Sequence, residues 1–189
     1  MMPAHGPAVL LLAGSLVPAV QPPMPRPGDM APEIRATLLE EPARVVSLGS
    51  LKGRLIVLDF WASWCAPCLQ SFAHMNALAK DFQTQPVSFV SITHESATTV
   101  RPVLQKFPLH TTVALDTGCA TFRAYQAWGL PRVILIGADG RVKSLIAPDT
   151  LTADVIRKAL AGDTLDLPQI PPWPDPQGAE DFMCGAAAK

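Results

Sequence analysis

A dense run of apolar residues lies between positions 55 and 61 of this 189-residue chain. The apolar run from Leu55 to Leu58 is followed by Asp59 and by two aromatic residues. Because apolar side chains occupy both alternating sets of positions, this pattern predicts a strand buried on both faces. Residues 69–82 then carry apolar side chains at the three- and four-residue spacing of an amphipathic helix. The pattern therefore predicts a central strand that leads directly into a helix.

Shorter apolar and β-branched runs, separated by turn residues, predict the rest of the fold. The expected strands are residues 34–39, 44–48, 86–93, 111–115, 132–137 and 141–146. The expected helices are residues 97–107, 119–128 and 152–160, the last with Thr152 as N-cap and Gly162 as C-cap. A Glu-Glu-Pro turn follows the first strand and an Asp-Gly turn precedes the last, so both are expected to form hairpins. We therefore predict an α/β fold, a mixed sheet flanked by helices with an added N-terminal β-hairpin.

Two cysteines lie at the corner between the central strand and its helix, in the sequence Cys65-Ala66-Pro67-Cys68. The first turn of a helix has unpaired N–H groups and the positive end of the helix dipole, and both stabilise a thiolate. Pro67 falls at an early helical position, where its missing N–H costs nothing. Cys68 lies one turn further on, so its sulfur can reach Cys65. This arrangement favours a pair that switches between dithiol and disulfide.

Two other uses of a Cys-X-X-Cys pair are disfavoured by the rest of the sequence. A zinc site needs further ligands, but the four histidines and four cysteines include no second Cys-X-X-Cys and no His-X3–5-His pair. A haem attachment site needs His directly after the second cysteine, where this chain has Leu69. We therefore expect neither a metal nor another cofactor.

Two stretches of the chain resemble thioredoxin-fold proteins. Residues 59–68, Asp-Phe-Trp-Ala-Ser-Trp-Cys-Ala-Pro-Cys, are similar to the active-site stretch of that fold. The Leu-Lys-Gly-Arg lead-in at 51–54 resembles its TlpA/ResA branch, bacterial extracytoplasmic thiol–disulfide oxidoreductases. Residues 125–131, Tyr-Gln-Ala-Trp-Gly-Leu-Pro, resemble the cis-proline loop of the family. The resemblance covers residues 28–162 and implies a thioredoxin-like domain over residues 33–162.

The position of each active-site residue, read with this resemblance, suggests its role. Cys65, at the helix start, is expected to be the nucleophile, and the more buried Cys68 is expected to resolve the mixed disulfide. Asp59 matches the buried aspartate of thioredoxin. Burial raises the pKa of a carboxyl group, which can then exchange a proton with Cys68 near neutral pH. The TlpA/ResA branch often has Glu where this chain has Ser71, so more of the acid–base work is expected of Asp59.

The resemblance also implies a substrate-binding edge. Pro131 is expected to be cis and to face the cysteines, leaving the edge of Leu130 free to pair with the backbone of a partner. Trp64 is expected to cover the site, and Trp128 is expected to be an exposed contact for the partner. His94, just past a strand end, is expected to be a solvated loop residue rather than an acid–base group.

The two remaining cysteines, Cys119 and Cys184, allow two interpretations. They can form a structural disulfide that ties the tail to the domain, which would contribute roughly 4 kcal/mol for a long loop. Alternatively, Cys184 is a free thiol of the tail. The sequence favours neither.

Both ends of the chain are rich in proline. Thirteen of the 20 prolines lie in residues 3–32 and 168–176, so we expect poorly ordered or extended ends, a linker at 20–32 and a C-terminal tail at 163–189. Residues 1–19 resemble a signal peptide, with an apolar core and a Val-Pro-Ala sequence, although no Lys or Arg precedes the core. We therefore expect an extracytoplasmic, periplasmic location, with this segment either cleaved or retained as an anchor.

Composition and charge narrow the partners. The net charge is -1 and no Lys/Arg cluster is present, so nucleic acid is not an expected partner and membrane contact is limited to the N-terminal segment. We expect a monomer that meets a disulfide-containing protein substrate and an upstream thiol electron donor. The expected activity is dithiol–disulfide exchange with exported proteins, as a reductant, because Asp59 and the Leu130-Pro131 pair resemble thioredoxin more than strong oxidases.

Three other functions are weighed against this one. A peroxiredoxin-like peroxidase would need a Pro-X3-Thr-X2-Cys arrangement at its nucleophile, and the chain has none. A copper-binding assembly protein would use Cys65, Cys68 and a later His, but the last histidine is His110. A domain that acts only as an interaction module would show no activity against any disulfide.

Overall fold

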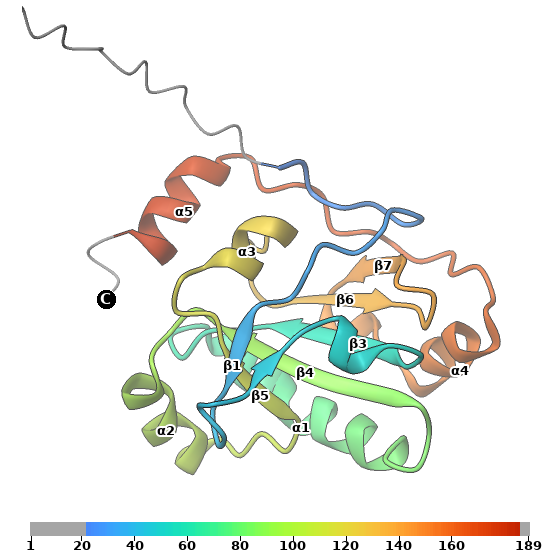
Figure 1. The fold of residues 1–189 in the computed structure, drawn as a ribbon, viewed down its shortest axis with the longest axis horizontal. Helices are drawn as coiled ribbons and strands as arrows, with labels where there is room; N and C mark the ends of the chain where they lie inside the picture. Colours follow the sequence, from blue (N-terminus) through green and yellow to red (C-terminus); the bar gives the residue numbers. More distant parts are fainter. Residues whose placement is uncertain (1–21, 186–189) are drawn as a thin grey trace, which may run out of the picture.

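Strand β3 (Leu55–Phe60) lies at the centre of the structure, and all six of its residues are buried. The computed structural model of the protein describes residues 22–185 (Figure 1). Seven strands form one mixed sheet in the order β2-β1-β5-β4-β3-β6-β7. The other strands are β1 (Ala36–Leu38), β2 (Val45–Val46), β4 (Val87–Thr93), β5 (Thr112–Leu115), β6 (Arg132–Ile136) and β7 (Val142–Ile146). The apolar run thus forms the central strand, as its pattern predicts.

Helices cover both faces of the sheet (Figure 1). They are α1 (Ala66–Asp81), α2 (Ala97–Lys106), α3 (Ala120–Tyr125), α4 (Ala153–Ala161) and α5 (Pro176–Cys184), with 3-10 turns η1 (Gly49–Leu51) and η2 (Pro148–Thr150). Helices α1 and α4 pack on the face of β3 that carries Leu55 and Val57. Helix α3 and Met183 of α5 pack on the opposite face, against Leu58 and Phe60. The predicted α/β sheet flanked by helices is confirmed.

Strand directions bring several loops to one edge of the sheet. Strands β3, β4 and β5 run parallel, so their carboxyl ends meet at the same edge. Strand β6 runs antiparallel to β3, with Arg132 opposite Phe60, so β6 begins at that edge. Open α/β sheets place their sites at the carboxyl ends of parallel strands. The segments at 61–68, 94–96, 116–119 and 129–131 therefore converge there.

Local signals for the helix ends and hairpins agree with the structure in most places. The N-terminal hairpin forms, with Thr37 of β1 opposite Val45 of β2. Thr152 caps α4 by accepting a hydrogen bond from Val155 N, and Gly162 ends that helix at φ 83°. Helix α3 is shorter than predicted. It ends at Tyr125 because the next residue, Gln126, adopts a left-handed backbone conformation with φ 50°.

The proline-rich segments differ from the prediction because both are attached to the domain. Gly28 N donates to Val142 O at 2.8 Å and Ala31 N donates to Gly140 O at 2.9 Å, so residues 28–31 follow the last hairpin. The tail contains the unpredicted helix α5, which begins with Asp175 as N-cap and Pro176 at its first position. A tail with a capped helix is not merely extended, and that expectation is wrong for residues 176–184.

The predicted signal peptide at 1–19, and with it the question of anchoring, lies outside the described residues. Over residues 22–185, no helix is long and apolar enough to span a bilayer.

Candidate active site

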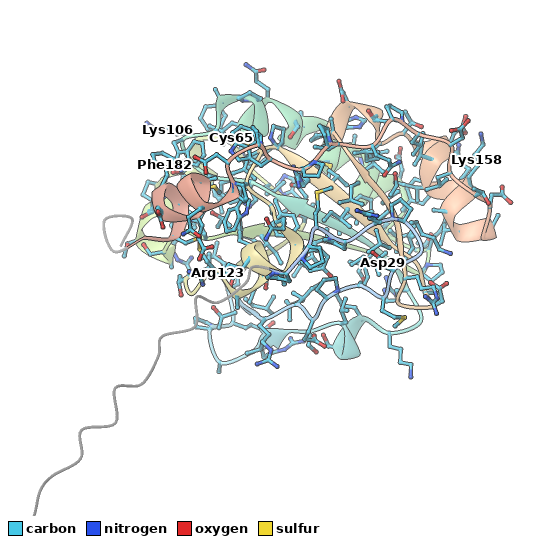
Figure 2. The ribbon with its side chains drawn as sticks, turned by 90° about the horizontal axis from the view of Figure 1, so that it is seen from above. Asp29, Cys65, Lys106, Arg123, Lys158 and Phe182 are labelled. Carbon is cyan, nitrogen blue, oxygen red and sulfur yellow. A yellow bond between two sulfur atoms is a disulfide. The ribbon has the colours of Figure 1, made fainter. Side chains whose placement is uncertain are left out.

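The Cys65–Cys68 pair lies where β3 gives way to α1, and the two sulfurs form a disulfide of 2.03 Å (Figure 2). Cys65 is the N-cap of α1, and its sulfur accepts a hydrogen bond from Cys68 N at 3.3 Å. Pro67 occupies the first turn of the helix, as its position in the sequence predicts. Cys65 is 5% exposed and Cys68 is fully buried. The helix N-terminus is therefore directed at the more accessible sulfur, where it stabilises a thiolate.

Asp59 is buried on the same face of β3 as Val57 and Trp61, the face that α1 covers. Burial raises its pKa from 3.8 to about 7, and a hydrogen bond from Ser91 opposes part of this rise. The Ser91 hydroxyl donates to Asp59 Oδ2 at 3.1 Å, while Oδ1 has no hydrogen-bond partner. A carboxyl group in this state can take up or release a proton near neutral pH.

The peptide bond between Leu130 and Pro131 is cis and immediately precedes β6. Leu130 packs against the buried cluster that contains both active-site cysteines. Pro131 lines a pocket of about 530 Å³ together with Pro67 and His74 of α1. The structure thus brings the cis-proline loop to the start of α1.

Glu95 is part of the site, although the sequence did not assign it a role. Its carboxylate accepts hydrogen bonds from Ser63 N at 2.6 Å and from Ser63 Oγ at 2.5 Å, and Thr93 Oγ1 lies 3.2 Å away. These bonds connect the loop before Cys65 to the end of β4. Its position just past a strand end was the available signal, but its pairing with Ser63 depends on the folded sheet.

The prediction that His94 is solvated is wrong. His94 is 9% exposed, its ring centroid lies 5.3 Å from that of Phe122 in an edge-to-face contact, and Nε2 has no hydrogen-bond partner. Burial lowers its pKa, while the nearby charge of Glu95 opposes this effect. Trp64, which is expected to cover the site, is 51% exposed. Its ring lies 5.6 Å from that of Phe182 in α5.

The expected exposure of Trp128 is also wrong, because this side chain is only 3% exposed. Its indole N–H donates to Gln126 Oε1 at 3.0 Å. The tail packs over the neighbouring Gly129, where an added Cβ would lie 2.8 Å from Trp173. Trp128 therefore belongs to the core, and its predicted contact with a partner loses its basis.

Cys119 and Cys184 form a second disulfide, so the structure selects the first of the two interpretations. Cys119 is the residue before α3, and Cys184 is the last residue of α5. The bond spans 65 positions and joins the tail to the domain. Unlike the first pair, it connects two distant segments.

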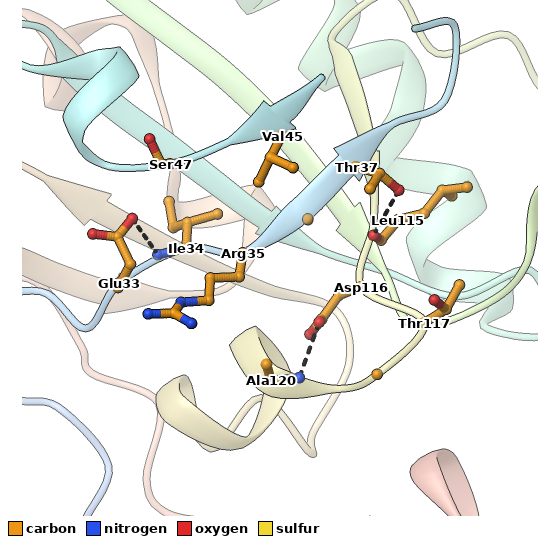
Figure 3. Close-up of a pocket in the computed structure, with 12 residues that line it drawn as sticks. Glu33, Ile34, Arg35, Thr37, Val45, Ser47, Leu115, Asp116, Thr117 and Ala120 are labelled. Atoms are coloured by element: carbon orange, nitrogen blue, oxygen red, sulfur yellow. Dashed lines mark hydrogen bonds between the residues drawn. The ribbon is translucent and has the colours of Figure 1, made fainter. Parts of the chain in front are cut away.

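A pocket of about 630 Å³ lies between β1 and the segment from Leu115 to Ala120, and it contains no cysteine (Figure 3). There Asp116 accepts a hydrogen bond from Ala120 N at 2.9 Å. Within residues 22–185, no group of three or more His, Cys, Asp or Glu side chains is arranged to hold a metal ion.

The fold and the site at the junction of β3 and α1 together define a class of protein. A thioredoxin-like sheet carries a Cys-X-X-Cys pair at the start of α1, a cis-proline loop beside it and a buried aspartate on the central strand. More particularly, the profile of the Redoxin family matches residues 26–160, and the chain belongs to that family.

Named relatives point to the same class. The chain is 32% identical over 112 residues to the thiol-disulfide oxidoreductase ResA of Bacillus subtilis, a match covering 59% of this chain and 62% of that protein. It is 30% identical over 134 residues to ResA of Geobacillus thermodenitrificans, covering 70% of this chain and 75% of the relative. A structure of a candidate thiol:disulfide interchange protein DsbE from Chlorobium tepidum matches with TM-score 0.60 and 31% identity, covering 65% and 86% of the two chains.

Proposed function

We propose that this protein is a thiol–disulfide oxidoreductase that exchanges its Cys65–Cys68 pair with disulfides in other proteins. The observation that carries the proposal is the disulfide at the N-terminus of α1, with Cys65 Sγ receiving a helix N–H. A structural bridge needs no such donor, whereas a leaving and attacking thiolate is stabilised by it. The names of the ResA relatives support the same activity.

The reaction divides into two thiolate attacks. The Cys65 thiolate attacks one sulfur of the substrate disulfide, forming a mixed disulfide and releasing the other substrate sulfur as a thiolate. The Cys68 thiolate then attacks Cys65 Sγ, forming the Cys65–Cys68 disulfide and releasing the substrate as a dithiol. The protein loses two electrons and the substrate gains them. An upstream thiol donor returns the pair to the dithiol.

Asp59 serves as the proton acceptor for the second step. Cys68 is fully buried, so its thiol needs an internal base before it can attack. Asp59 lies on the strand face beneath α1, and burial raises its pKa to about 7. Residue 71 is a serine whose hydroxyl donates to Cys68 O at 2.7 Å, so it stabilises the helix turn and offers no carboxyl group.

The substrate backbone pairs with the edge of the cis-proline loop. Leu130 and Pro131 are half-buried beside the cysteine cluster, which leaves part of each available to a partner. An extended segment can add there as a short strand and align its disulfide with Cys65.

The proposed direction is reduction, and the proposed location is outside the cytoplasm. Thioredoxin-like use of Asp59 with Leu130-Pro131 favours a reductant. The second disulfide favours an oxidising compartment, because structural disulfides are rare in the cytosol of most organisms.

Trapping of mixed disulfides tests the proposal. A Cys68→Ser variant keeps the nucleophile and loses the resolving thiol, so it should accumulate covalent complexes with substrate proteins. The matched control is Cys65→Ser, which leaves only the buried Cys68 thiol and should capture far less. Non-reducing electrophoresis and mass mapping give the answer. Equal capture by the two variants, or no capture by either, would contradict the proposal.

A further inference from the structure

A groove runs beside Trp64 towards the second disulfide. It has a volume of about 710 Å³, and its walls include Trp64, His94, Phe182, Met183 and the Cys119–Cys184 bond. We refer to this space as the α5 groove. The residue that precedes Cys65 and the end of helix α5 both line it.

Helix α5 is linked by its side chains to α3 and to the residue that precedes α3. Within α5 only Met183 is buried, and an isolated helix of nine residues is unstable in water. The Cys119–Cys184 bond fixes its C-terminal end, and an ion pair between Arg123 and Glu180 holds its middle. These two attachments make α5 a defined wall rather than a loose tail.

Two large aromatic side chains at the groove remain exposed to solvent. Trp64 is 51% exposed and Phe182 is 70% exposed, and their rings meet edge to face at 5.6 Å. Exposed apolar side chains that gather in one place mark interaction sites more often than isolated ones do. Because Trp64 directly precedes Cys65 in the chain and its ring contacts that of Phe182, a polypeptide in disulfide exchange with Cys65 must lie close to these two aromatic side chains.

The lining of the groove indicates which side chain it accepts. Among the described residues that line it, none is Lys or Arg, and one is the acidic residue Glu95. Apolar atoms of Trp64, Phe182 and Met183 favour an apolar occupant. An acidic occupant would meet Glu95 with no cation nearby, which disfavours it.

We propose that the α5 groove binds an apolar side chain next to the target cysteine of the protein substrate, and that Phe182 and the Cys119–Cys184 bond set this preference. This inference rests on the proposed function, because it assumes that a protein disulfide reacts at Cys65. It assigns the tail of the chain to substrate selection. The substrate class is therefore a disulfide-bonded polypeptide with an apolar, non-acidic residue beside its reactive cysteine.

Three substrates separate the inference from the proposed function. Two are disulfide-bonded peptides that differ only in having Leu or Glu next to the cysteine, and the third is bis(2-hydroxyethyl) disulfide, which is too small to fill the groove. Reduced wild type should react about tenfold or more faster with the Leu peptide than with the Glu peptide, as expected for an apolar pocket. A wild type that reacts with none of the three would overturn the proposed function and this inference with it.

Phe182→Ala is the direct test, with Phe107→Ala as the matched control. Phe107 is 45% exposed and directly follows α2, about 12 Å along the helix from Thr99, a residue that lines the groove. Phe182→Ala should lower the Leu-to-Glu rate ratio several-fold, because the most exposed apolar side chain of the groove is removed, whereas Phe107→Ala should keep the ratio. A preserved ratio in Phe182→Ala, or an equal loss on all three substrates, would overturn the inference.

The Cys119→Ser/Cys184→Ser double variant tests the role of the Cys119–Cys184 bond in holding α5. With its fold checked by circular dichroism, it should still reduce bis(2-hydroxyethyl) disulfide but lose the preference for Leu. Full retention of the preference would contradict the part assigned to the bond. Sedimentation of the wild type provides a last check, because a dimer that Phe182→Ala abolishes would assign the groove to a second copy of the chain instead.

Discussion

The two disulfides of this protein begin at similar positions but differ in surroundings. Cys65 is the N-cap of α1, and Cys119 occupies the equivalent position before α3. At Cys65 the sulfur itself accepts a helix N–H, from Cys68 at 3.3 Å. At Cys119 the sulfur has no such bond, because the carboxylate of Asp116 accepts from Ala120 N at 2.9 Å and from Phe122 N at 2.8 Å.

This difference shows that a helix N-terminus stabilises a thiolate only if its N–H groups are free to do so. Asp116 already supplies a negative charge at the start of α3, so a second anion at Cys119 would be repelled. Burial raises the pKa of Asp116 to about 6, partly offset by its backbone hydrogen bonds, which leaves it mostly ionised at neutral pH. We conclude that the first pair is suited to exchange and the second to holding α5.

Loss of the first disulfide should abolish disulfide reduction, whereas loss of the second should not. Cys65→Ala should lower the reduction of bis(2-hydroxyethyl) disulfide to the uncatalysed background, because no other accessible thiol lies at a free helix N-terminus. Cys119→Ser/Cys184→Ser should keep most of this activity. Single-turnover assays on pre-reduced protein measure both. Comparable losses in the two variants would remove the distinction between the pairs.

The Cys119–Cys184 disulfide should contribute more to the free energy of unfolding than the Cys65–Cys68 disulfide does. Its loop of 65 positions predicts a loss of about 4 kcal/mol in the free energy of unfolding when both cysteines become serine. The Cys65–Cys68 loop spans only three positions, so the same chain-entropy argument gives it a smaller share. Urea denaturation followed by tryptophan fluorescence tests this. A double variant as stable as wild type would mean that α5 stays attached without its bond.

Asp59→Asn should affect only the first pair and should change the pH dependence of stability. The folded pKa of about 7 exceeds the ordinary value of 3.8, so ionisation favours the unfolded state. As far as Asp59 is concerned, the free energy of unfolding of the wild type is therefore highest below about pH 4 and falls as the pH rises towards 7. The difference between the folded and the ordinary pKa of Asp59 corresponds to a decrease of at most about 4 kcal/mol in the free energy of unfolding.

The variant should lack this decline and be the more stable protein at pH 8. It should also exchange disulfides more slowly near neutral pH, because the proton acceptor for Cys68 is gone. Denaturation curves at pH 4, 6 and 8 and rate measurements at the same pH values provide the comparison. Parallel stability curves for the two proteins would show that Asp59 is not a desolvated acid.

A smaller difference between the two pairs should appear in the alkylation rate of the cysteine that remains when its partner is replaced by serine. Cys65 in a Cys68→Ser variant should be alkylated about tenfold or more faster at neutral pH than Cys119 in a Cys184→Ser variant. Both cysteines are buried to a similar degree, 5% and 2% exposed, so the comparison reports mainly on the thiolate. Equal alkylation rates would indicate that Asp116 has no influence on Cys119.

Much of the site was predictable because its signals are local. The apolar run, the Cys-X-X-Cys spacing and the Leu130-Pro131 pair each occupy a few consecutive residues, and they led to β3, the N-terminus of α1 and the cis-proline loop. Asp59 was predictable for the same reason, since an acid inside a strand that is apolar on both sides must be buried.

Long-range packing explains where the predictions from the sequence differ from the structure. The burial of His94 depends on Phe122, and the burial of Trp128 on contacts that the sequence does not reveal. Helix α5 was missed because the prolines of the tail outweighed its N-terminal signal, Asp175 followed by Pro176. The pairing of Cys119 with Cys184 could not be chosen either, because it depends on where α5 docks.

A redox titration with mass mapping tests the central claim most directly. Wild-type protein is equilibrated with increasing ratios of reduced to oxidised dithiothreitol, quenched by alkylation and digested, so that each cysteine is scored separately. Our account predicts that Cys65 and Cys68 become reduced first, while Cys119 and Cys184 remain joined until much more reducing conditions. Reduction of the Cys119–Cys184 bond at the same ratio, or before the Cys65–Cys68 bond, would contradict it.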